Sequence, residues 1–272
     1  VTVETNGVED GQTLTIELNS NTYTGSISNN SVTITIQSDD LQALSEGSNT
    51  ITANVSDLAG NAASQASYTF TYDKSIPSID SIVTSWGTHL NSIEDNSDGT
   101  ITVTTSGVEN GQTLTVTMNS TDYTGSISNN SVTITVSATN LQALNEGTIT
   151  IIANVNDAAD NPAPQASTTF IYDKTLPIIN SVTTSWGSIL NATEDNSNGT
   201  VTIATTGVED GQIVTIVLNG VSYTGSISSN STSITISSSN LQALTNNTSY
   251  TITADVNDDA GNSATQSSTT FT

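Results

Sequence analysis

The chain has no cysteine and no arginine, and its only lysines are Lys74 and Lys174. Without cysteine, neither a disulfide framework nor a zinc–thiolate site can form. Against two basic residues stand 26 acidic ones, which give a formal net charge of -24 at pH 7. Such a chain has no basic groove for phosphates and repels both nucleic acid and anionic lipid. We therefore predict no nucleic-acid partner.

Long hydrophobic runs are also absent. A membrane-spanning helix needs about 18 or more consecutive apolar residues, and the sequence contains no such run. No charged-then-apolar leader opens the sequence, so we expect no membrane insertion and expect any targeting signal to lie outside it. Hydrophobic residues make up 33% and aromatic residues 4% of the 272 positions. This is little for one large core, and two or three domains of about 100 residues fit better.

The sequence is repetitive, with a period of 100 residues. Three similar segments begin at residues 1, 101 and 201: VTVETNGVEDGQTLTIELNS, ITVTTSGVENGQTLTVTMNS and VTIATTGVEDGQIVTIVLNG. Acidic chains with few aromatic residues are often disordered, but a repeat of this length indicates tandem folded units instead.

Each copy has the pattern of short β-strands. Thr, Val and Ile alternate with a period of two, as in residues 133–136, and clusters of Gly and Asn such as residues 107–111 separate the runs. This pattern predicts an all-β fold of tandem immunoglobulin-like antiparallel β-sandwich modules with Greek-key topology, in an extended array. For the second copy we predict strands A to G over 79–90, 100–105, 113–119, 123–126, 132–137, 148–155 and 167–172. Trp86 and Trp186 are expected on strand A, packed against a sheet edge or linker.

The predicted module boundaries follow the strand that ends in YDK. The segments YDKSIP at 72–77 and YDKTLP at 172–177 end a strand and continue into a proline that restricts the chain. We interpret both as linkers. The predicted modules are residues 1–73, which lack their strand A, residues 74–173 and residues 174–272.

Acidic residues recur where such sandwiches would join. Because neighbouring strands alternate in direction, the end of strand G in one module is expected to meet the BC and FG loops of the next. The candidate ligands are the linker acids Asp73 and Asp173, the FG-loop acids Asp57, Asp157 and Asp258, the BC-loop acids Glu9, Glu109 and Glu209, and Asp80 and Asn180 in strand A.

Clustered carboxylates without basic partners favour a hard cation. Ca²⁺ takes six to eight oxygen ligands in flexible geometry, whereas softer metals would need His or Cys clusters. We predict Ca²⁺ at these junctions. Other interpretations stay open: the FG-loop acids could form Asx turns, the linker acids could be solvated or pair with the two lysines, and the BC-loop acids could belong to simple turns.

A second candidate lies in EDNSDG at 94–99, which contains Glu94, Asp95 and Asp98 and is echoed at 194–199. It resembles the first half of an EF-hand loop. However, position twelve would be Thr105 rather than a bidentate Glu, and no flanking helices are predicted. A plain turn is the other open interpretation.

The order GVEDGQTLTIELNSNTYTGSIS, then LQALSEG, then ITANVSDLAGNAASQASYTFTYDKSIPSI resembles the tandem bacterial immunoglobulin-like extender repeats of giant RTX-type biofilm and host-cell adhesins, including ice-binding ones. The resemblance implies an extracellular stalk on the bacterial cell surface, stiffened by Ca²⁺ at or near domain junctions, with the adhesive target bound by another domain. The positions that match are Asp57, Asp157, Asp258, Asp73 and Asp173. The copies depart from one another where Gly60 becomes Asp160 and Asp80 becomes Asn180.

The predicted function is therefore a structural spacer whose partners are calcium ions and neighbouring modules. The alternative is a module that binds a ligand directly, such as a glycan, ice or another adhesin chain, although the low aromatic content offers little for a carbohydrate platform. We predict no enzymatic activity. His89 has no Ser or Cys partner pattern, and the acids lie in turns rather than in a cleft suited to paired carboxylates.

Overall fold

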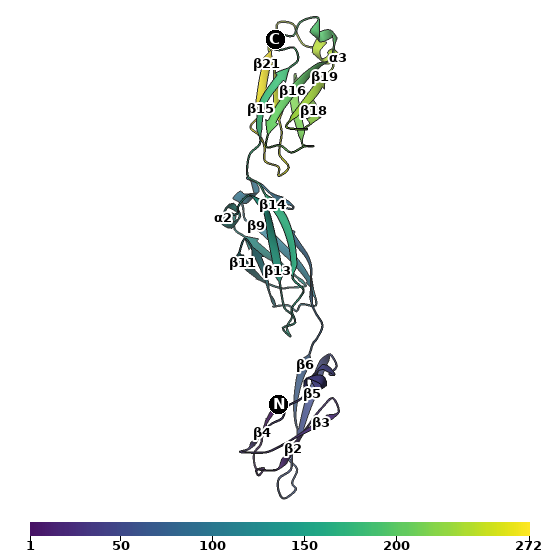
Figure 1. Cartoon of the computed structure of the whole chain (residues 1–272), viewed down its shortest axis with the longest axis vertical. Helices are drawn as coiled ribbons and strands as arrows, with labels where there is room; N and C mark the ends of the chain where they lie inside the picture. The colour runs from purple at the N-terminus through teal and green to yellow at the C-terminus, as the bar shows by residue number, and fades with distance from the viewer. The chain divides into compact units, whose positions relative to one another are not determined.

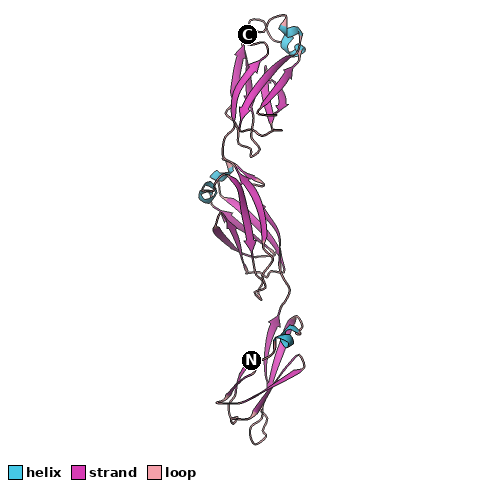
Figure 2. Ribbon diagram, in the orientation of Figure 1, coloured by secondary structure: helices cyan, strands magenta, loops and turns pink.

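The computed structural model describes all 272 residues. Antiparallel strands connected by short turns dominate it, and the only helices are short (Figures 1 and 2). The α-helices are α1 (Ser38–Gln42), α2 (Ala138–Gln142) and α3 (Ser238–Gln242), and the 3-10 turns are η1 (Glu94–Asn96) and η2 (Glu194–Asn196). None of these helices has the length and apolar character needed to cross a membrane. The names first, second and third module are kept for residues 1–73, 74–173 and 174–272.

Two sheets face each other in the second module. One sheet has the order β12 (Ser131–Val136), β9 (Gly99–Ser106), β7 (Ser78–Thr84). The other has the order β11 (Thr121–Ser126), β10 (Thr113–Met118), β13 (Gly147–Asn154), β14 (Ala166–Tyr172), β8 (His89–Leu90). All pairs are antiparallel except β8 with β14. Side chains that alternate inward along these strands form one buried core.

The third module repeats this plan, and the first contains part of it. In the third module the sheets are β15 (Ile178–Thr184), β16 (Gly199–Thr206), β19 (Ser231–Ile236), and β18 (Val221–Ser226), β17 (Ile213–Leu218), β20 (Tyr250–Asp255), β21 (Ser267–Phe271). In the first module they are β1 (Thr2–Glu4), β4 (Ser31–Thr33), and β3 (Asn21–Ser26), β2 (Thr13–Leu18), β5 (Gly47–Asn54), β6 (Ala66–Tyr72). No strand pairs with the outer edge of β1.

The predicted fold class is confirmed, while two strand assignments are wrong in detail. The fourth strand, β11, pairs with β10 and not with β12, so it is a C′ strand rather than a D strand. A two-residue turn, Asn119-Ser120, joins them with φ values of 49° and 60°, the positive values that a tight hairpin requires. The predicted strand A is split into β7 and β8, which lie in opposite sheets, by a turn in which Thr84 Oγ1 donates to the Gly87 carbonyl at 2.7 Å.

The contacts divide the chain into two compact units. One contains residues 1–77 with 156–162, and the other contains residues 78–155 with 163–272. Three separate hydrophobic cores lie within residues 3–72, 79–172 and 179–271. The predicted module boundaries at 73/74 and 173/174 stay predictions.

The tryptophans lie in the cores, so the expectation of an edge or linker position is wrong. Trp86 is 7% exposed and packs edge-on against Phe170 at 5.2 Å between ring centroids. Trp186 does the same with Phe271 at 5.3 Å. The turn after β7 directs Trp86 inward over Gly99, where an added Cβ would clash with Trp86 Cζ3. The tryptophan of the sequence TSWG therefore packs against Gly99, the first residue of β9.

We expect Gly99→Ala to destabilise the second module by about 1–3 kcal/mol, because the added methyl group overpacks a filled core. The measurement is urea unfolding of Gly99→Ala, Trp86→Leu and the double variant. Since the smaller side chain makes room for the methyl group, the double variant should lose less stability than the two single changes add up to. Strict additivity would contradict the predicted clash.

Candidate functional site at the module junctions

Each FG loop is shaped by an aspartate that accepts hydrogen bonds from an asparagine four residues later. Asn262 donates its backbone N–H to Asp258 Oδ1 at 2.8 Å and its Nδ2 to Asp258 Oδ2 at 3.0 Å. The same two bonds join Asn161 to Asp157 at 2.8 and 2.9 Å and Asn61 to Asp57 at 2.7 and 2.8 Å. The aspartates therefore hold Asx-type turns, as one of the open interpretations predicts.

These bonds change the acidity of two of the carboxyl groups. Hydrogen bonds from the side chain and backbone of Asn61 hold the pKa of Asp57 below its usual value. Burial acts to raise the pKa of Asp157, which is 1% exposed, but bonds from Asn161 and from the Ala159 backbone outweigh it and lower the pKa. Both carboxylates are therefore stabilised in their charged form by local donors.

The BC-loop glutamates lie beside the FG loops, as the alternation of strand direction predicts. Glu9 Oε2 accepts the Leu58 N–H at 2.9 Å, and Glu209 Oε2 accepts the Asp259 N–H at 2.8 Å. Glu109 occupies the equivalent place in the sequence of the second module. In the first and third modules the BC and FG loops thus form one pole of the sandwich.

A fully buried amide fastens the third module to the end of the second. Asn262 is 0% exposed, and its Nδ2 also donates to the Asp173 carbonyl at 2.9 Å. Its Oδ1 accepts the Ser92 N–H at 2.9 Å, and the neighbouring Asn91 Nδ2 donates to the Ala260 carbonyl at 3.0 Å. The FG hairpin of the third module is therefore bonded both to the linker and to the turn that follows β8.

Asn161 is the counterpart of Asn262 and makes an equivalent bond within the unit that contains residues 1–77 and 156–162. Asn161 Nδ2 donates to the Asp73 carbonyl at 3.2 Å. The residue before it, Asp160, has a φ of 67°. Its counterparts in the first and third modules, Gly60 and Gly261, have φ values of 90° and 87°. Asp tolerates this left-handed conformation better than most residues, and Gly adopts it freely.

The linker beyond Asp173 is held by its own bonds. Asp173 Oδ1 accepts the Thr175 N–H at 2.9 Å, and Glu146 Oε1 accepts the Lys174 N–H and the Thr175 hydroxyl, both at 2.9 Å. In the earlier linker, Asp73 Oδ1 accepts the Ser75 N–H at 2.9 Å. Neither lysine forms an ion pair, and the one such contact joins His89 Nε2 to Asp259 Oδ2 at 3.5 Å.

Asp173 carries uncompensated repulsion. Partial burial raises its pKa, and the negative charges of Asp258, Glu146 and Glu209 raise it further, although the Thr175 bond acts in the other direction. Three acidic side chains from the second and third modules thus act on one linker carboxylate.

The strand A candidates lie within their own sandwiches. Asp80 accepts hydroxyl bonds from Ser106 at 2.6 Å and Ser78 at 2.7 Å, which lower its pKa. Asn180 Nδ2 donates to Thr206 Oγ1 at 2.8 Å. Both residues lie where the register of the pair shifts by one residue.

The three acids of the EDNSDG segment each have a different partner. Glu94 Oε2 accepts the Asn91 N–H at 3.2 Å, Asp98 Oδ1 accepts the Ala138 N–H at 2.9 Å at the start of α2, and buried Asp95 accepts the Tyr172 hydroxyl at 2.7 Å. Burial and this carboxylate raise the pKa of Tyr172. The segment contains the 3-10 turn η1. Its side chains bond to Tyr172 at the C-terminal end of β14 and to Ala138 at the start of α2.

The donor chemistry at the junction between the second and third modules suits calcium, because it consists of carboxylate and backbone carbonyl oxygens, and only Asp259 has a basic partner, His89. The positions of the side chains do not complete such a site: no three acidic or histidine residues lie close enough together to hold a metal ion. The ligand set therefore stays a prediction. Sequence reasoning missed Asn262, Asn161, Asn91, Ser92 and Glu146; the recurrence of Asn four residues after the FG aspartate was the available signal.

No protein-family model matches the chain, and no curated protein does either. Among solved structures, the chain is similar to part of a 1.5-MDa bacterial ice-binding adhesin, with 23% identity, a TM-score of 0.47, and coverage of 100% of this chain and 88% of that one. A Ca²⁺-stabilised adhesin with which an Antarctic bacterium binds ice is 22% identical, with a TM-score of 0.45 and coverage of 100% and 67%.

A tetra-tandem repeat from the extending region of a large adhesion protein is 18% identical, with a TM-score of 0.33 and coverage of 99% and 69%. These three structural neighbours are regions of bacterial adhesins. The immunoglobulin-like fold itself follows from the strand order described above.

We expect Asn262→Ala to loosen the joint between the second and third modules. The change leaves the part-buried Ser92 N–H and the Asp173 carbonyl without their partner, which costs about 1–3 kcal/mol in local opening. Native-state hydrogen exchange at Ser92 and over 172–176 is the measurement. The matched control is Asn61→Ala, which removes the same side-chain bond to the turn aspartate but no bond to a preceding linker. Unchanged exchange at Ser92 would contradict the assignment.

Acid should open the FG hairpins of the first and second modules. Because the folded-state pKa values of Asp57 and Asp157 are lowered, their stabilising effect is complete above the usual Asp pKa of about 3.9 and is lost as pH falls through the lower folded value. Amide exchange of Asn61 and Asn161, corrected for intrinsic rates, should accelerate in that window. In Asp57→Asn the acid response at Asn61 should disappear; a response that persists there would exclude Asp57 as its source.

Proposed function

We propose that this chain is a segment of the extracellular stalk of a bacterial cell-surface adhesin. Its modules act as spacers, their junctions limit bending, and Ca²⁺ bound at or near the junctions stiffens them further, so that an adhesive domain elsewhere in the parent protein is held away from the cell. The observation that carries the proposal is the buried Asn262 amide, which bonds to the linker and to the turn after β8.

A spacer needs junctions that resist bending. The junction between the second and third modules has hydrogen bonds that can limit its bending. The linker is only a few residues long, and donors and acceptors from both sides bind it. Glu146 accepts two bonds from Lys174 and Thr175, and Asn262 donates to Asp173. A free hinge would instead leave these backbone groups to water.

Calcium would act on the charge that the protein leaves uncompensated. Asp173, Asp258 and Glu209 are the residues that would hold it, with Glu146 close enough to influence Asp173. When bound, the ion supplies positive charge that these carboxylates lack. A ligand that binds only the folded state stabilises it by about 2.7 kcal/mol at about 100 times its Kd.

The partners of this role are calcium and neighbouring modules, and the adhesive target belongs to another domain. The role uses no catalytic group. The proposed place is the outer bacterial surface, where the strong net negative charge helps to keep the chain soluble.

Adding Ca²⁺ to chelated protein should raise the melting temperature and increase the radius of gyration measured by X-ray scattering. Both effects should shrink in the double variant Asp173→Asn with Asp258→Asn, because it removes two proposed ligand charges while keeping their shape. The control is Glu17→Gln with Asp39→Asn, which removes the same charge from exposed positions in the first module. Equal responses of the two double variants would reject Asp173 and Asp258 as ligands, and no response of the wild type would reject calcium stiffening.

A further inference from the structure

Lysine occurs at only one position of the repeat. The chain has two lysines and no arginine, and each lysine lies two residues after the last residue of a strand, Lys74 after β6 and Lys174 after β14. Both side chains are exposed. Neither lies within ion-pair distance of any of the 26 acidic residues. Ion pairing with the acids therefore does not explain why lysine stands in both linkers.

An exposed lysine in an extended linker is the feature that trypsin-type serine proteases recognise. Their specificity pocket carries an aspartate that takes a basic side chain, and the bond after that residue is cut. Outside the two linkers, the only basic side chain of the 272 residues is His89. A protease of this class can therefore cut the chain only at Lys74–Ser75 and Lys174–Thr175, both between modules.

The backbone around Lys174 is occupied, although its side chain is exposed. The Lys174 N–H donates to Glu146 Oε1, and the Thr175 N–H donates to Asp173 Oδ1, both at 2.9 Å. The Thr175 hydroxyl donates to the same oxygen of Glu146 at 2.9 Å. Both residues of the bond that a protease would cut are thus held by carboxylates.

The residues before Lys174 are held as well. The Asp173 N–H donates to the Leu90 carbonyl at 3.0 Å, and the Ile171 N–H donates to the Thr88 carbonyl at 2.9 Å. The Asp173 carbonyl accepts from Asn262 Nδ2 at 2.9 Å. These partners come from β8 and its flanking residues in the second module and from the FG hairpin of the third.

These bonds occupy the groups that a protease needs. An extended peptide is bound largely through hydrogen bonds to its main chain. Tyr172, two residues before Lys174, pairs with Gly147 on one side and Leu90 on the other, and its side chain is 0% exposed. The linker can therefore enter a protease only after it has left Glu146 and the FG hairpin of the third module.

We propose that Lys174–Thr175 is a concealed cleavage site for a serine protease that cuts after lysine, and that opening of the junction uncovers it. Water adds across the peptide bond, so that Lys174 gains a carboxylate and Thr175 an amine, and no other reactant is consumed. The cut separates the second module from the third and lies outside both cores. The concealment depends on the hydrogen bonds of the junction and not on the proposed calcium.

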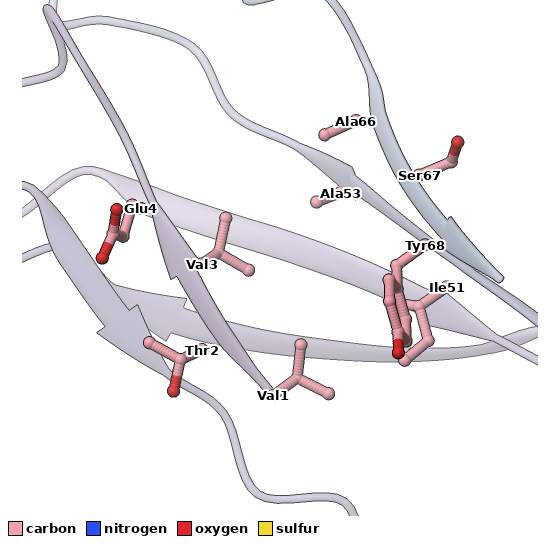
Figure 3. Close-up of a pocket in the computed structure, with 9 residues that line it drawn as sticks. All are labelled: Val1, Thr2, Val3, Glu4, Ile51, Ala53, Ala66, Ser67 and Tyr68. Carbon is pink, nitrogen blue, oxygen red and sulfur yellow. The ribbon is translucent and has the colours of Figure 1, made fainter. Parts of the chain in front are cut away.

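The second linker is the better one to test, because each module beside it has the outer strand, β7 or β15, that covers the core. In the first module, β1, β5 and β6 line an open groove of about 450 Å³, where Figure 3 shows Val3 and Tyr68. The strand that leads to Lys74 borders this groove, so its surroundings do not match those of Lys174. The test therefore uses chains with Lys74→Gln, in which Lys174 is the only lysine.

The probe is trypsin, added to the full chain in the presence of a chelator, and the fragments 1–174 and 175–272 are followed by mass spectrometry. A synthetic peptide of residues 170–180, whose backbone is free, should be cut readily. The same bond in the full chain should be cut at least roughly a hundredfold more slowly, because cleavage of a folded protein follows the population of its opened form. Lys174→Gln should abolish cleavage.

Two variants open the linker from different sides. Glu146→Ala and Asn262→Ala each remove a partner of the linker backbone, and each should speed cleavage roughly tenfold or more. The matched controls are Glu46→Ala and Asn61→Ala, the same changes in the first module, which should leave the rate unchanged. Glu146 is exposed, so its removal should leave both cores intact, and amide exchange in β13 and β17 checks this.

Each of four results would overturn the proposal. If trypsin does not cut the free peptide, the sequence is no substrate. If it cuts the full chain as fast as the peptide, the bond is not concealed. Equal acceleration by the controls in the first module would separate the effect from the junction. An unchanged rate in Glu146→Ala, with β13 and β17 still protected, would show that the Glu146 bonds do not conceal the site.

Discussion

Hydrogen bonds from backbone N–H groups to carboxylates are the interaction on which the loops of this protein depend. A chain with 26 acidic residues and two lysines cannot neutralise its acids with salt bridges, and a single His–Asp contact is all that occurs. The acids instead accept from the main chain at turns and loop ends; examples are Glu9, Asp10, Asp57, Asp73, Asp98, Glu146, Asp173, Glu209 and Asp210. Bonds of this charge-assisted kind are stronger than neutral ones and fix the loops that carry them.

The local pattern of the sequence was enough for the fold class but not for every pairing. Alternating Thr, Val and Ile residues identify strands because the side-chain period is two whatever the partner strand is. Which sheet β11 joins depends instead on the short Asn119-Ser120 turn, which forces it back onto β10. The break between β7 and β8 and the burial of Trp86 depend on Gly99 and Phe170, far away in the sequence. These are tertiary effects that periodicity does not carry.

The candidate site was also predictable from the sequence only in part. Strand direction predicts that Glu209 and Asp258 share a pole, and the bond from Asp259 to Glu209 agrees with it. The amide of Asn262 could not be found in this way, because Asn in a Gly-rich loop usually signals only a turn. Its recurrence at positions 61, 161 and 262 was visible, but its bond to a preceding linker depends on how two sandwiches meet. The pKa of Asp173, raised by burial and by acids from separate loops, is likewise a property of the assembled junction.

Turn formation and the proposed metal binding would not exclude each other at these aspartates. An ionised carboxylate has about four acceptor positions, and Asp258 uses only some of them for Asn262. The same local bonds that shape the hairpin also orient the carboxylate, which would lower the cost of ordering it around an ion. Amide donors join the linker to the FG loop, so the proposed calcium would add to a joint that hydrogen bonds also hold. The remaining repulsion at Asp173 is the part of the junction that hydrogen bonds do not remove, and it is there that a divalent ion has the most to contribute.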